Sequence, residues 1–234
     1  GGGTPSLLPT QFLDQILNAL AARFSLGSDT EISLEANPDS LTLPGRAADL
    51  KALGITRLSI GVQSFHPGRL KLLGRAHTAG QARKAVDAAR TAGFANISLD
   101  CIRGLPGAGA VPAHTRKSWL WELQQAVALE PQHISAYCLT LEPGTPLCAG
   151  AGALRFPAES TQTAMFHEGA AYLASQGFLQ YEVSNFARAG FTCRHNQGYW
   201  RGEDYLGLGP GAVSTIAATR STNAPDFARW RAAC

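Results

Sequence analysis

Two carboxylates, one side-chain amide and a glycine-rich turn are the groups in this sequence whose types and spacing suit ligand binding. The turn, Gly1–Thr4, leaves backbone N–H and C=O groups open to a small ligand because no side chain blocks the approach. Glu35, Gln63 and Asp100 each follow an apolar, β-branched run, so each is predicted at the carboxyl end of a strand. Together these groups predict one polar pocket.

Strands that alternate with helices would bring these residues together. The predicted strands are Glu31–Ala36, Arg57–Val62, Asn96–Ile102 and His133–Leu141, and the predicted helices are Thr10–Phe24, Pro44–Leu53, Gln81–Ala92 and Ser118–Leu129. Alternation at intervals of about 25 to 40 residues predicts parallel βαβ units, and hence a partial (β/α) barrel, with a doubly wound sheet as the alternative. In a barrel the carboxyl ends of the strands share one face, which carries the active site.

Arg75, in the loop-like stretch Leu73–His77, adds a guanidinium that pairs well with a carboxylate ligand. A single strand-end carboxylate is more often a helix cap or a loop charge, and a lone arginine is more often a surface charge. The repetition in consecutive βα units favours a functional pocket. His66 and His77 have no partner pattern and are predicted to be structural.

The pattern changes after residue 145, so we expect one domain over residues 1–145 and a second region over residues 146–234. The second region predicts a helix at Glu159–Gln176, a strand at Gln180–Val183 and a final helix at Pro225–Cys234. No strand precedes the glycine turn, and the final helix has no end signal. We therefore expect a barrel truncated at both ends.

The charge and composition of the sequence argue against a nucleic-acid-binding or membrane-bound protein. The formal charge of +3 over 234 residues is small and scattered, which argues against a nucleic acid or a membrane surface as partner. No apolar run approaches the roughly 18 to 20 residues that span a bilayer. Five widely spaced cysteines without a C-x-x-C pair indicate reduced thiols and a cytoplasmic location.

Several motifs in order carry a family resemblance. They are Gly1–Ser6, Glu35–Pro38, Arg57–Phe65, Leu73–His77, Gly104–Gly107, His133–Tyr137, Tyr181–Ala187 and His195–Trp200. The sequence resembles the oxygen-independent coproporphyrinogen III oxidase-like branch of the radical S-adenosylmethionine (SAM) enzymes, and the last motifs are similar to the heme chaperones of that branch. The resemblance spans nearly the whole chain.

The resemblance implies a six-unit partial barrel that holds S-adenosylmethionine against a [4Fe–4S] cluster. By motif match, Gly2, Gly3 and Thr4 would contact the methionine amino and carboxylate groups, and Arg75 would pair with that carboxylate. The ribose and nearby polar atoms would be bound by Glu35, Gln63 and Asp100.

The resemblance also implies that heme or a porphyrin binds, with acceptor hemoproteins, membrane-associated ones included, as partners. The segment His195-Asn196-x-x-Tyr199-Trp200 would supply an imidazole to iron and aromatic faces to the porphyrin. The competing interpretation makes His195 a hydrogen-bonded structural residue and the aromatic side chains part of a core. A single histidine is a weak metal signal, so both interpretations stay open.

Three departures from the family pattern matter. The C-x3-C-x2-C cluster loop does not occur in the sequence, so no ligand of the cluster is predicted and no catalytic residue is named. The loop from Gly107 to Arg116 is longer than usual, and Val213 stands where the family commonly has histidine. Three functions remain: a heme-binding chaperone, which we prefer, a coproporphyrinogen III oxidase of porphyrin biosynthesis, and an inactive remnant. Whether the protein is an enzyme stays open.

Overall fold

The four apolar runs of the first part of the chain form the parallel strands of one sheet. They are β1 (Ser33–Ala36), β2 (Arg57–Gln63), β3 (Ile97–Arg103) and β4 (His133–Cys138), and they lie side by side in chain order. A doubly wound sheet would reverse its strand order, so this order is that of a barrel. The prediction of a parallel sheet of the barrel type is therefore confirmed.

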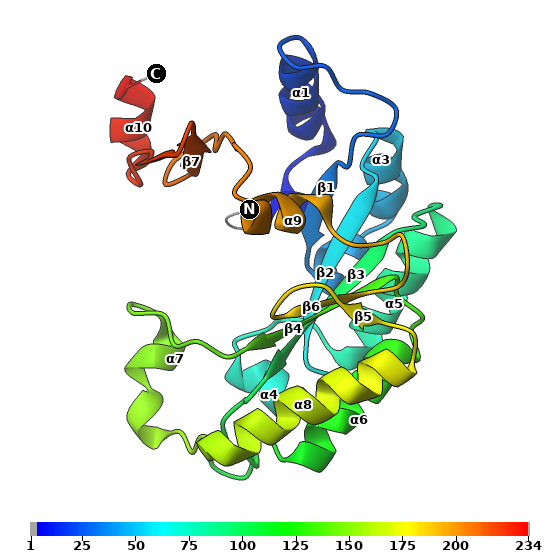
Figure 1. Ribbon diagram of the computed structural model, residues 1–234, viewed down its shortest axis with the longest axis vertical. Helices are drawn as coiled ribbons and strands as arrows, with labels where there is room; N and C mark the ends of the chain where they lie inside the picture. The colour runs from blue at the N-terminus through cyan, green and yellow to red at the C-terminus, as the bar shows by residue number, and fades with distance from the viewer. Residues whose placement is uncertain (1–3, 234) are drawn as a thin grey trace. The chain divides into compact units, whose positions relative to one another are not determined.

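The computed structural model describes residues 4–233, which divide into two compact units between Thr192 and Cys193. Figure 1 traces the sheet of the first unit and the helices around it. Among the described residues, no helix combines the length and the apolar character that crossing a membrane requires.

Two short strands extend the sheet beyond β4. The strand β6 (Asn185–Ala187) pairs with β4 in antiparallel fashion, and β5 (Leu179–Gln180) pairs with β6 at the edge. Of the predicted strand Gln180–Val183, only the first residue, Gln180, therefore lies in an observed strand. Runs of two and three residues are too short to show the alternation on which strand prediction depends.

The helices of the first unit begin and end close to their predicted bounds. The longer ones are α1 (Thr10–Ala21), α3 (Arg46–Ala52), α5 (Ala79–Thr91), α6 (Arg116–Val127) and α8 (Glu159–Ser175). The predicted capping box at Thr78 and Gln81 is present at the start of α5. Three short helices, α2 (Pro38–Leu41), α4 (Pro67–Leu72) and α7 (Pro146–Ala149), were not predicted, and each begins with proline at its first position.

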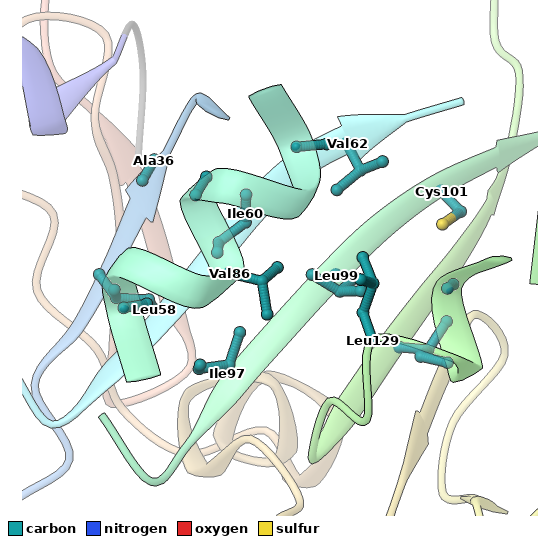
Figure 2. Packing of buried hydrophobic residues seen from close by; sticks show 14 of the residues in the cluster. Ala36, Leu58, Ile60, Val62, Val86, Ile97, Leu99, Cys101 and Leu129 are labelled. Carbon is teal, nitrogen blue, oxygen red and sulfur yellow. The ribbon is translucent and has the colours of Figure 1, made fainter. Parts of the chain in front are cut away.

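The two faces of the sheet differ in polarity because successive side chains of a strand point to opposite sides. Leu58, Ile60 and Val62 of β2 are fully buried, and Figure 2 shows them packed with β3 and with Val86 of α5. The alternate residues of β2 are Ser59, Gly61 and Gln63. The helices thus cover an apolar face, and the polar residues of the strands lie on the other.

A close approach of two helices completes the core of the first unit. In Figure 1, α8 runs alongside α6. A Cβ atom added at Gly169 of α8 would lie 2.7 Å from Trp119 Nε1 and 3.2 Å from Leu123 Cδ1, both on α6. A side chain at this position would therefore have to displace Trp119 or Leu123, and both are buried.

The second unit contains helix α9 (Arg194–Arg201), a hairpin of β7 (Val213–Ile216) and β8 (Thr219–Thr222), and helix α10 (Phe227–Ala233). The turn of the hairpin is Ala217-Ala218, and both residues have positive φ, 47° and 61°. Two positive φ values identify a type I′ turn, which favours asparagine and glycine over alanine. Helix α10 matches the predicted final helix, whereas α9 was predicted only as a polar, aromatic segment.

Candidate functional site

A cavity of about 150 Å³ opens on the polar face of the sheet, over β1, β2 and β3. Asp100, predicted at the end of its strand, is the fourth of the seven residues of β3. The cavity is lined by Thr4, Glu35, Ala36, Asn37, Ser59, Gly61, Gln63, Arg75 and Asp100. Five of these residues were predicted from the sequence to share a pocket, and the structure brings all five together. Gly2 and Gly3, which were predicted to join them, lie outside the described residues.

Asp100 is a half-buried carboxylate whose pKa is shifted by its surroundings. The hydroxyl of Ser59 lies 3.0 Å from both carboxylate oxygens and donates to them. Burial raises the pKa of Asp100 to about 6, hydrogen bonds from Ser135 and Ser59 partly offset this, and the nearby charge of Glu35 adds to it. The group therefore titrates close to neutral pH.

Asn37 joins the two ends of the pocket. Its side-chain nitrogen donates to Thr4 Oγ1 at 3.0 Å, and its side-chain oxygen accepts from Arg75 Nη1 at 3.3 Å. Burial lowers the pKa of the Arg75 guanidinium, while the charges of Asp100 and Asp39 oppose that shift. The guanidinium is thus held beside carboxylates and an amide, and it lines the cavity.

Gln63 enters the cavity from an irregular end of β2. The pairing of β2 with β3 shifts register between Ile60 and Gln63, and Gln63 has a φ of 64°. A Cβ atom at Gly61 would lie 2.9 Å from Gln63 Nε2, so the amide occupies the space that a side chain at Gly61 would take. The bulge turns Gln63 toward the ligand cavity, a common use of bulges beside functional sites.

A second hollow of about 410 Å³ adjoins the cavity and shares Glu35, Gln63 and Asp100 with it. Its remaining lining is more apolar and consists of Ile102, Tyr137, Cys138, Leu139 and Thr140 from β3, β4 and the segment after β4. The three shared residues thus stand between a polar cavity and a wider, partly apolar one.

Sequence reasoning missed four of the nine lining residues, Ala36, Asn37, Ser59 and Gly61, and the last three could have been found. Ser59 and Gly61 precede Gln63 by four and two positions on β2, so strand alternation places all three on one face. Asn37 follows Glu35 by two residues at the end of β1. Alternation from a predicted site residue was therefore the signal that could have found them.

The donor set of the cavity suits a ligand of mixed charge. Two carboxylates attract a cationic centre or accept from hydroxyl groups, and the guanidinium binds a carboxylate. Two side-chain amides offer both donors and acceptors. A small zwitterion with a cationic centre and a diol would satisfy these groups together.

The four predicted heme-binding residues lie on α9 in the second unit. His195, Tyr199 and Trp200 are exposed, and Asn196 is half-buried. The rings of His195 and Tyr199 meet edge to face at 4.6 Å, and Tyr199 makes a similar contact with Tyr205 at 4.5 Å. Because 63% of Trp200 is exposed, its aromatic face is not part of a core.

No group of three or more His, Cys, Asp or Glu side chains within residues 4–233 is placed to hold a metal ion. Four of the cysteines fall in this range, and none of the four is in a disulfide bond. The residues described here thus give no ligand set for an iron–sulfur cluster.

Comparisons with known proteins agree with the geometry. The family model of the Radical SAM superfamily matches residues 1–110. The heme chaperone HemW of Escherichia coli is 40% identical over 216 residues, which cover 92% of this chain and 55% of that protein. The mitochondrial radical S-adenosyl methionine domain-containing protein 1 of Mus musculus is 43% identical over 214 residues, 91% of this chain and 47% of that protein.

Among solved structures, coproporphyrinogen III oxidase (HemN) from Escherichia coli matches with a TM-score of 0.80 over 97% of this chain and 54% of that one. At 24% sequence identity this match establishes the fold alone. The chain spans about half the length of the curated relatives it matches. The sheet, the family match and these relatives lead to one conclusion: residues 1–110 carry a Radical SAM superfamily domain, and the chain is similar over most of its length to the HemW heme chaperones.

Proposed function

We propose that this chain is part of a heme chaperone that binds S-adenosylmethionine in its barrel, binds heme, and passes heme to hemoproteins. The observation that carries the proposal is the 40% identity to HemW over 92% of the chain. The 8% of this chain that lies outside the alignment with HemW is shorter than the second unit. The similarity to HemW therefore extends beyond the barrel and into the region of α9.

The cavity supports the first part of the proposal. S-adenosylmethionine offers a sulfonium cation, an amino-acid zwitterion and a ribose diol, which are the groups that the cavity's donors and acceptors suit. In this proposal Arg75 binds the methionine carboxylate and Thr4 lies beside it, with Gly2 and Gly3 contributing backbone groups. Glu35, Gln63 and Asp100 bind the ribose and neighbouring polar atoms.

The exposed face of α9 supports the second part. His195 and Tyr199 are four residues apart, so they share one side of the helix. Such a side presents an imidazole to heme iron and an aromatic ring to the porphyrin. Trp200 adds a second exposed aromatic face, and Asn196 precedes it by one helical turn.

A heme titration tests this assignment. Wild-type protein is expected to shift the Soret band of added hemin, and His195→Ala is expected to weaken binding by about tenfold or more. His167→Ala is the matched control, because His167 is also exposed, on helix α8. Equal affinities for wild type and the variants His195→Ala, Tyr199→Ala and Trp200→Ala would remove the assignment.

The alternative function is oxidative decarboxylation of coproporphyrinogen III. The likeness to HemN concerns the fold and gives this activity no separate support. Anaerobic conversion of coproporphyrinogen III to protoporphyrinogen by the same preparation would establish the enzyme, and its absence together with heme binding would favour the chaperone. A preparation that does neither would agree with the inactive remnant.

A further inference from the structure

A buried carboxylate on α6 holds the segment that follows β2. Glu122 is 1% exposed and lies outside the set of residues that line the cavity. Its Oε1 accepts from Ser64 Oγ at 2.6 Å and from Arg69 Nη1 at 3.1 Å, and its Oε2 accepts from the Phe65 N–H at 2.6 Å. Both carboxylate oxygens of Glu122 therefore accept hydrogen bonds. Without such partners, burial of the charge would carry a large cost in free energy.

The residue just before this segment is Gln63, in an unusual backbone conformation. The Ser64 N–H donates to the Val62 carbonyl at 2.8 Å, which closes a three-residue turn around Gln63. With φ at 64°, this turn has the rarer and strained form of such turns. A strained conformation persists only where its surroundings fix it, and such residues gather at functional sites.

The same carboxylate lies close to the loop that follows β3. His114 Nδ1 accepts from the Leu105 N–H at 3.2 Å, and His114 Nε2 lies 3.7 Å from Glu122 Oε1. This second distance is too long for a direct hydrogen bond. Burial lowers the pKa of His114, so the ring is neutral and offers the carboxylate the polar N–H of Nε2 rather than a charge. Glu122 therefore stands where the loops after two neighbouring strands converge.

Burial alone would raise the pKa of Glu122, but interactions with His114, Ser64 and the Phe65 N–H outweigh it, so the pKa lies below its usual value. The group is therefore an anion at neutral pH and accepts all of these bonds. A charged acceptor gives the loop stronger hydrogen bonds than a neutral one would.

We infer that Glu122 is a positioning residue for ligand binding: by fixing Ser64 and Phe65 it holds Gln63 in the left-handed conformation that directs its amide into the cavity. The inference rests on the proposed function, because the ligand used to test it is S-adenosylmethionine. Glu122 itself does not line the cavity and acts through Gln63.

A double-mutant cycle on ligand affinity tests this. We would measure S-adenosylmethionine binding by isothermal titration calorimetry for wild type, Gln63→Ala, Glu122→Gln and the double variant. Gln63→Ala is expected to weaken binding about tenfold and Glu122→Gln about three- to tenfold. The double variant is expected to bind no worse than Gln63→Ala alone, because both changes remove the same contact.

The control variant is Leu123→Ala, which empties core space on the same helix one residue away from Glu122. It is expected to lower the melting temperature and leave the affinity within about twofold of wild type. If Glu122→Gln does not fold, Ser64→Ala replaces it in the cycle, since it removes a single donor to the carboxylate.

Wild-type affinity in Glu122→Gln, losses that multiply in the double variant, or an equal loss in Leu123→Ala would each overturn the inference. Failure of the wild-type protein to bind S-adenosylmethionine would refute the proposed function itself. That result differs from every variant comparison, so the two failures are distinguishable.

Discussion

Replacing Asp100 with asparagine is expected to make the protein more stable at neutral pH and less dependent on pH. Burial raises the pKa of Asp100 from 3.8 to about 6, so the carboxyl binds its proton more tightly in the folded than in the unfolded state. The resulting stabilisation is present at low pH and is lost as the pH rises through 6. The full effect is about 3 kcal/mol, of which about 1.4 kcal/mol appears between about pH 7.5 and pH 5.

The amide of Asp100→Asn carries no charge, so the variant avoids the cost of the buried anion. It also gives up one of the two oxygens that accept from Ser59, which costs about 1 kcal/mol. The net expectation is a gain of about 2 kcal/mol in the free energy of unfolding near pH 7.5, and a smaller difference near pH 5. A gain in stability on removal of a charged site residue is typical of functional sites.

Urea unfolding of both proteins near pH 7.5 and near pH 5 measures how the difference in unfolding free energy between variant and wild type changes with pH. The titration of all other groups cancels in this comparison. Asp87→Asn on α5 is the control, because Asp87 is exposed and is not among the residues that line the cavity. A wild-type protein that loses as much stability as Asp100→Asn between the two pH values would refute the reasoning. So would a variant that is less stable than wild type near pH 7.5.

Two further predictions concern stability. Gly169→Ala is expected to lower the free energy of unfolding by about 1–3 kcal/mol, because the new methyl group would overlap Trp119; a rise in the urea midpoint, the usual result for glycine in a helix, would contradict it. Ala218→Gly is expected to raise that free energy by about 0.5–1 kcal/mol, because it relieves a positive φ in the type I′ turn; a lower melting temperature in calorimetry would contradict it.

Much of the fold could be predicted from the sequence because its signals are local and long. The strands that contain Glu35, Gln63 and Asp100 are apolar runs of clear length, and the capping box at Thr78 marks one helix start without ambiguity. Parallel strands in chain order then place their carboxyl ends together. The shared pocket of Glu35, Gln63 and Asp100 is a direct result of that topology.

The contacts that complete the site could not be predicted in the same way. Asn37 bonds Thr4 and Arg75, which are 33 and 38 residues away along the chain. Glu122 bonds Ser64 over 58 residues, and nothing in its helical pattern distinguishes it from a surface glutamate. Such partners are fixed by packing in three dimensions, and one sequence shows no periodic signal of it.

The backbone carbonyl of Val62 is bonded both by the turn that carries Gln63 and by the loop that carries Arg75. The Val62 oxygen accepts from the Ser64 N–H at 2.8 Å and from His77 Nε2 at 3.0 Å. Burial lowers the pKa of His77, so the ring is neutral and donates from Nε2. The turn that presents Gln63 and the loop that presents Arg75, two residues before His77, therefore share one anchor. The segments that present Gln63 and Arg75 to a ligand have therefore already lost their conformational entropy on folding. Recognition then depends on a preorganised cavity more than on a conformational change when the ligand binds.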